Sequence, residues 1–90
     1  MDEHSTPTFA QVIQLLRDLG FVQVYAKKGV IAYAHNDSGA EFLFRDRELD
    51  TPARETELTT LRIQLTYRGL LTEQEFRRFL SGKPVTTPQQ

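Results

Sequence analysis

The chain has 90 residues, of which 39% are apolar and 26% charged, and its formal net charge is −1. This length supports one domain with one modest core, and the small net charge argues against strong, nonspecific nucleic-acid binding over the whole surface. The absence of cysteine excludes disulfides and a thiol nucleophile and suits a reducing compartment. We expect a cytoplasmic protein with no membrane contact, because the N-terminus is acidic and polar and no apolar run is long enough to span a membrane.

The first helix is predicted to begin at Thr8. The sequence Thr8-Phe9-Ala10-Gln11 has the form of a capping box, in which the threonine hydroxyl and the glutamine side chain satisfy free backbone amides. Apolar residues then recur at helical spacing, which indicates a buried stripe. Residues 1–7 show no such periodicity and are expected to form a tail.

Two helices are predicted to end in the same way, at a glycine followed by an apolar residue. The segments are Leu16–Phe21 and Leu65–Leu70. The glycine can adopt the left-handed conformation that is needed just past a helix end. The apolar residue after it can then pack back against the first residue of the same segment.

Between these two helix ends, valines and aromatic residues predict strands at residues 21–26, 30–35 and 40–45. The turns are predicted at Lys27-Lys28-Gly29 and at Asn36-Asp37-Ser38-Gly39. Three consecutive strands joined by hairpins form an antiparallel meander.

The register of the second hairpin sorts its side chains by size. With Asp37-Ser38 as the loop, the predicted pairs are His35 with Ala40, Tyr33 with Phe42, and Ile31 with Phe44. The heavier, more aromatic face contains Ile31, Tyr33, Ala40, Phe42 and Phe44, and we assign it to the helices. A slip by one residue would mix the two faces. The other face carries Val30, Ala32, Ala34, Glu41, Leu43 and Arg45.

A second helix is predicted at residues 53–68, with Pro52 suited to its first turn and with Leu58, Leu61 and Leu65 as its inner stripe. A second capping box at residues 72–75 opens a short third helix. The order α-β-β-β-α with a short C-terminal helix predicts an α+β fold of two layers, with a three-stranded antiparallel meander and the helices on one face. The single domain is expected at residues 8–81, between flexible tails at 1–7 and 82–90.

The arrangement resembles the HicA-like (YcfA-like) small toxins of toxin–antitoxin systems, whose fold is related to double-stranded RNA-binding domains. The matching parts lie between Thr8 and Leu71: the first helix into Leu19-Gly20-Phe21, Lys28-Gly29, the segment 33–39, and Arg68-Gly69-Leu70. The resemblance implies RNA as the first candidate ligand and an antitoxin-like protein as a candidate partner.

The same resemblance implies a catalytically silent copy. Family members are typically ribonucleases with a catalytic histidine in a glycine-serine-histidine motif on the second strand, whereas this chain has Gly29-Val30-Ile31. The spacing before this motif is one residue longer than usual, but no shift recovers a histidine, because none lies between His4 and His35. Isoleucine cannot transfer a proton.

Five basic residues are candidates for contacts with RNA phosphates: Lys27, Lys28, Arg45, Arg47 and Arg62. Double-stranded RNA is recognised largely by its shape and backbone, so such loop and helix residues would suffice. The alternative is that they are simply solvated, and the alternating charges of Arg45-Asp46-Arg47-Glu48 favour an ordinary exposed loop over a phosphate clamp. The alternative function is a protein-interaction module, either a homodimer or a toxin–antitoxin-type complex, formed through the outer sheet face or the edge of the third strand.

A third interpretation is an enzyme built around His35, near Asp37. A hydrogen-bonded turn histidine is the simpler explanation, because the sequence places no nucleophile or second base beside it. Two distant histidines and no cysteine predict no metal site, and the scattered glycines form no phosphate loop. We therefore expect no cofactor.

Overall fold

The computed structural model describes residues 6–81. Along the chain these residues form α1 (Phe9–Asp18), β1 (Val22–Lys27), β2 (Val30–His35), β3 (Ala40–Arg45), α2 (Glu55–Tyr67) and α3 (Glu73–Leu80). The strands make one antiparallel sheet in the order β1-β2-β3. The predicted α+β meander is confirmed. Residues 1–5 and 82–90 of the predicted tails lie outside the described residues, and Pro7 is already buried.

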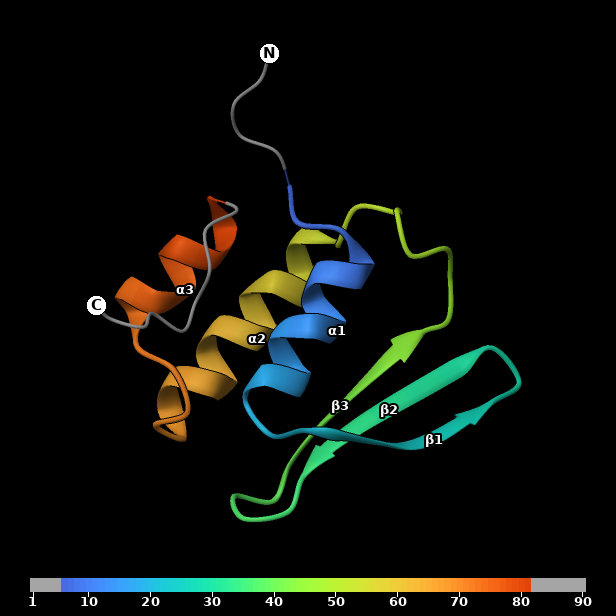
Figure 1. The fold of residues 1–90 in the computed structure, drawn as a ribbon, viewed down its shortest axis with the longest axis horizontal. Coiled ribbons are helices and arrows are strands. Elements are labelled where there is room, and N and C mark those ends of the chain that lie inside the picture. Colours follow the sequence, from blue (N-terminus) through green and yellow to red (C-terminus); the bar gives the residue numbers. More distant parts are fainter. Residues whose placement is uncertain (1–5, 82–90) are drawn as a thin grey trace.

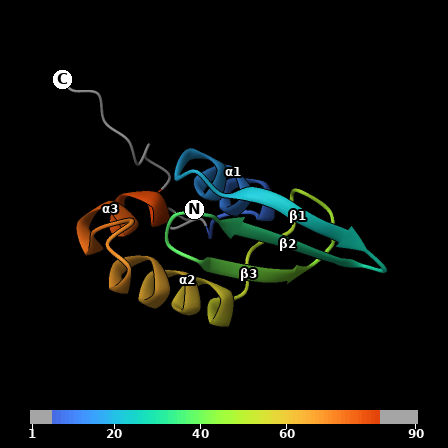
Figure 2. The same cartoon turned by 90° about the horizontal axis from the view of Figure 1, so that it is seen from below.

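The molecule has two layers. α1 and α2 lie side by side on one face of the sheet, and α3 follows α2 on its far side (Figure 1). Figure 2 views the molecule from the sheet side and shows none of the described elements in front of the strands. The helices therefore cover one face of β2 and β3 and leave the other face of the sheet uncovered, whereas every residue of β1 is exposed.

The predicted register of the second hairpin is confirmed. His35 pairs with Ala40 and Tyr33 with Phe42, in an unbroken ladder from Val30 to His35. The first hairpin is tighter than predicted, because Lys27 belongs to β1 and only Lys28 and Gly29 form the turn. Both turn residues have positive φ, 54° and 77°, as a two-residue type I′ turn requires. The β1 ladder is irregular between Gln23 and Tyr25.

Both predicted helix ends have the hydrogen bonds of a Schellman motif. In the first segment, Leu16–Phe21, the amide of Phe21 donates to the Leu16 carbonyl at 2.9 Å, and Gly20 has φ 98°. In the second segment, Leu65–Leu70, the last amide donates to the first carbonyl at the same distance.

α2 begins later than predicted. Pro52 is not in its first turn but forms an isolated bridge with Thr8, and the amide of Ala53 donates to the carbonyl of Pro7 at 2.8 Å. The helix starts only at Glu55, with Arg54 as its N-cap. The loop before α2 thus closes over the start of α1, where carbonyls of this loop also accept hydrogen bonds from the Phe9 and Ala10 amides.

The core lies between the helices and the heavier sheet face. Its largest fully buried side chains come from α1, β2 and α2 and are Phe9, Val12, Leu16, Tyr33, Leu61 and Leu65. Ile31 is partly buried and packs against this core. The predicted facing of the sheet is therefore confirmed, and α3 adds Phe76 and Phe79 to the same core.

Candidate functional site

The uncovered side of the sheet, called the open face below, has three rows of side chains that run across the strands. The register of the two ladders defines these rows, because directly paired residues point to the same face. The basic row is Lys27, Val30 and Arg45; the central row is Tyr25, Ala32 and Leu43; the far row is Val22, Ala34 and Glu41.

Large apolar side chains on the open face are strongly exposed. Leu43 is 64% exposed and Tyr25 is 46% exposed, and Ala32 between them is 1% exposed. The small alanine is thus enclosed by its two large neighbours. Val22 in the next row is 50% exposed. Single exposed apolar residues are ordinary, but several in adjacent positions mark a candidate interaction surface.

Three of the five predicted RNA-contacting residues gather at one end of this face. Lys27 and Arg45 flank Val30 in the basic row, and Lys28 lies in the adjoining turn. A backbone hydrogen bond of 2.9 Å from Asp46 to Gly29 fixes this end of the sheet. Within residues 6–81 none of these three cations has an ion-pair partner.

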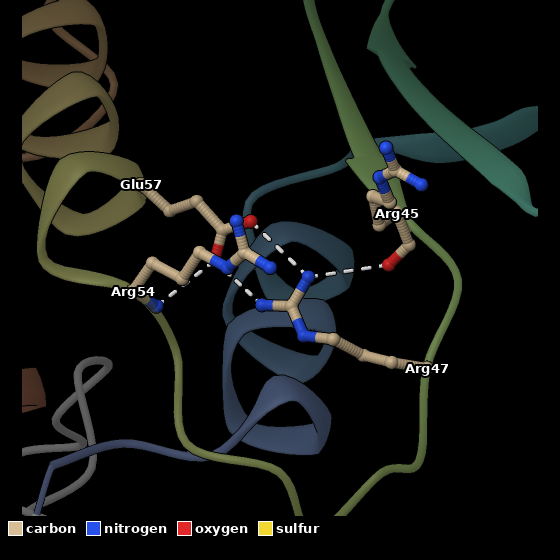
Figure 3. Close-up of polar contacts among 4 residues, drawn as sticks. All are labelled: Arg45, Arg47, Arg54 and Glu57. Atoms are coloured by element: carbon tan, nitrogen blue, oxygen red, sulfur yellow. Dashed lines mark hydrogen bonds and ion pairs between the residues drawn. The ribbon is translucent and has the colours of Figure 1, made fainter.

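The fourth residue, Arg47, is bound inside the molecule (Figure 3). Its guanidinium makes two hydrogen bonds to the Glu57 carboxylate, at 3.1 and 2.5 Å, and a third to the Arg45 carbonyl. It also lies 4.5 Å from the centroid of the Phe9 ring, within the range of a cation–π contact. Its Nε is buried and has no hydrogen-bond partner among the described residues. Arg47 therefore joins the loop to α1 and α2.

The same contacts change the pKa of the Glu57 carboxyl group. Partial burial acts to raise its pKa, but the hydrogen bonds from Arg47 and from the Arg54 backbone amide, together with the two positive charges, lower the pKa below its ordinary value of 4.5. Ionisation of Glu57 is thus favoured in the folded state.

The fifth residue, Arg62, lies on α2 and pairs with Glu73 of α3 at 3.1 Å. Both side chains are about half exposed, so this pair has a small effect on stability. The structure therefore brings Lys27, Lys28 and Arg45 together at the end of the sheet and uses Arg47 and Arg62 in contacts between elements.

His35 is part of a closed turn. Its Nδ1 accepts a hydrogen bond from the Ser38 amide at 3.2 Å and lies 2.9 Å from the Ser38 hydroxyl oxygen. That oxygen also accepts a hydrogen bond from the Ala40 amide, and the imidazole packs on Phe21. The predicted hydrogen-bonded turn histidine is confirmed, and its partner in the turn is Ser38.

Arg68 ties this turn to the helical layer. Its guanidinium donates to the Ser38 carbonyl at 2.8 Å across 30 residues of chain. No local pattern in the sequence indicates this contact, because Arg68 and Ser38 are so far apart along the chain. The His35 Nδ1 and the Ser38 hydroxyl oxygen both make hydrogen bonds within the hairpin. The pair therefore has a structural role.

A shallow hollow of about 160 Å³ lies between β3 and α2, lined by Phe42, Leu43, Phe44, Thr56, Glu57 and Thr60. It is smaller than the roughly 300–1,000 Å³ typical of small-molecule sites. Across residues 6–81, no three or more His, Cys, Asp or Glu side chains form a group that could hold a metal ion. No described helix is both long and apolar enough to cross a membrane.

Comparisons of the chain with protein-family models, curated proteins and solved structures find no match. The resemblance to HicA-like toxins therefore depends on the motifs of the sequence alone.

Proposed function

We propose that this protein is a protein-interaction module that binds its partner through the open face of the sheet. The observation that carries the proposal is the exposure of Leu43, Tyr25 and Val22 on adjacent rows of a face that no described element covers. Burying such side chains against a partner removes apolar surface from water, at roughly 25 cal/mol per Å².

The chemistry of this face supports a protein rather than a small molecule. Its centre is apolar, and charged residues lie only at its ends. Protein interfaces commonly have an apolar, often aromatic centre within a polar rim. A cytoplasmic location remains part of the proposal and is supported by the absence of cysteine.

A photo-reactive amino acid placed at position 43 tests this function in the cells that make the protein. The matched control carries the same group at Ile63, which is 48% exposed on α2 and outside the open face. We expect a cross-linked protein product from position 43 and none from position 63. Products of equal yield at both positions, or none at position 43, would contradict the proposal.

RNA binding at the basic row and turn is the second candidate function. It is favoured by the grouping of Lys27, Lys28 and Arg45, which are free of ion pairs within residues 6–81. Three phosphate contacts predict weak, salt-sensitive binding. An electrophoretic shift of structured RNA that is lost in Lys27→Ala/Lys28→Ala would support it, whereas a shift unchanged by these substitutions would contradict it.

We also propose that this module is catalytically silent. In place of the family's histidine, Ile31 lies against the core, and the His35 imidazole is engaged by Ser38. RNA incubated with the purified protein should stay intact. Cleavage that is abolished by His35→Ala would contradict this part of the proposal.

A further inference from the structure

β3 carries opposite charges at the two ends of the open face. Glu41 lies in the far row and Arg45 in the basic row, with Leu43 midway between them. Both charged residues are exposed. Neither has an ion-pair partner within residues 6–81, and Figure 3 shows the Arg45 guanidinium directed away from the Arg47–Glu57 pair. A surface with opposite charges at equal distances from an apolar centre can complement a second copy of itself.

We propose that the open face binds a second copy of this chain, in a symmetric dimer with the two sheets face to face. This inference rests on the proposed function and names its partner. The twofold axis lies between the sheets, runs across the strands, and passes over the central row of Tyr25, Ala32 and Leu43. Each residue of this row then faces the corresponding strand of the second copy, so that Leu43 lies against β3 of the other chain.

The axis across the strands places Arg45 of each copy opposite Glu41 of the other. Because the axis passes over Leu43, which is equidistant from the two charges along β3, both salt bridges form at once. The two charged pairs lie at the rim of an apolar centre, where they set the orientation of the interface.

The other symmetric way to stack the sheets is unfavourable. An axis parallel to the strands would place the basic row of one copy over the basic row of the second. Arg45 would then face Lys27, which occupies the same row on β1. Like charges in an interface disfavour association, so the charge pattern selects the axis across the strands.

The open face is small compared with the interfaces of stable complexes. Three strands of six residues cover about 280 Å² at spacings of about 4.8 Å between strands and 3.3 Å along them. Two such faces bury about half of the roughly 1,200 Å² at the lower end of stable complexes. We therefore expect a dimer that forms in the range of about 0.05 to 1 mM.

Sedimentation of the purified full chain over this concentration range tests the inference. The wild type should shift from monomer to dimer, and Leu43→Glu should weaken association more than about tenfold, because it places two carboxylates in the apolar centre. Ile63→Glu is the matched control and should associate like the wild type. Leu43 and Ile63 are both largely exposed, and circular dichroism will verify that each variant is folded.

A charge reversal tests the orientation of the axis. Arg45→Glu and Glu41→Arg, each alone, should weaken association about tenfold, since each creates two like-charge contacts in the dimer. The double variant restores both salt bridges with reversed sign and should associate within about threefold of the wild type. A double variant as weak as the single variants would overturn the proposed geometry.

A chain that remains monomeric at about 1 mM would overturn the dimer. If position 43 nevertheless cross-links in cells to a protein of another mass, the proposed function stands and only the identity of its partner is wrong. If position 43 gives no cross-link and the chain is monomeric, both proposals fail.

Discussion

The two faces of the sheet are built from neighbouring residues of similar polarity but differ in what covers them. Phe42 and Leu43 are adjacent on β3, yet Phe42 is 7% exposed and Leu43 is 64% exposed. On β2 and β3 the inner face packs under α1 and α2, and its side chains stabilise the fold. The open face has no such cover (Figure 2), so its apolar side chains contribute little to the fold and are available to a partner.

The largest expected change in the free energy of unfolding comes from truncating Phe42, and truncation of its neighbour Leu43 is the matched comparison. Phe42→Ala removes a ring that packs against Phe21, with 5.6 Å between the ring centroids, and it should lower the free energy of unfolding by about 3–5 kcal/mol. Leu43→Ala should change it by less than about 0.5 kcal/mol. Urea unfolding of both variants measures the difference, and equal losses would contradict the division between the two faces.

A second comparison uses one glutamate on each side of the sheet. Glu57→Gln weakens the contact to Arg47, whose side chain is only 13% exposed, and should cost about 1–3 kcal/mol of unfolding free energy. Glu41→Gln on the open face should cost less than about 0.5 kcal/mol. Chemical denaturation at neutral pH checks both values, and a larger loss at Glu41 would reverse the expected order.

The Glu57 contact also predicts a dependence on pH. Because its pKa in the folded state is lowered from 4.5, the stabilisation is fully present above that ordinary value and is lost as the pH falls through the lowered pKa. The difference in unfolding free energy between wild type and Glu57→Gln should therefore shrink below about pH 4.5. A difference that stays constant or grows on acidification would contradict this sign.

A loss of stability smaller than that of Phe42→Ala is expected at the two helix ends. Gly69 has φ 73°, and a Cβ there would meet no atom within 4 Å, so Gly69→Ala should cost only the backbone strain of about 1 kcal/mol. Gly20 has φ 98°, which lies further outside the left-handed region that residues with a Cβ tolerate. Gly20→Ala should therefore cost more than Gly69→Ala in thermal unfolding, and the opposite order would contradict this difference in backbone strain.

The sequence predicts most of the sheet because its determinants are local. The pair Asp37-Ser38 and the alternation of large and small side chains determine the register of β2 and β3, and glycine followed by an apolar residue determines two helix ends. These signals lie within a few residues of the structure that they specify.

The errors come from contacts between distant parts of the chain. The sequence predicts a helix that starts at Pro52 and Ala53. In the structure these two residues pair instead with Thr8 and Pro7, outside any helix. The alternating charges around Arg47 predict an exposed loop, but the Arg47 guanidinium binds the carboxylate of Glu57, which lies ten residues away on α2. Such partners become visible only when the chain is folded.

Backbone amide NMR spectra at increasing protein concentration test the central claim most directly, because they locate the surface that associates. Between about 0.05 and 1 mM, we predict shift changes that are centred on the central row, at Tyr25, Ala32 and Leu43. Amides at the exposed positions of α2, such as Ile63, should not shift. Changes confined to α2 or α3, or a spectrum that is independent of concentration, would contradict the account.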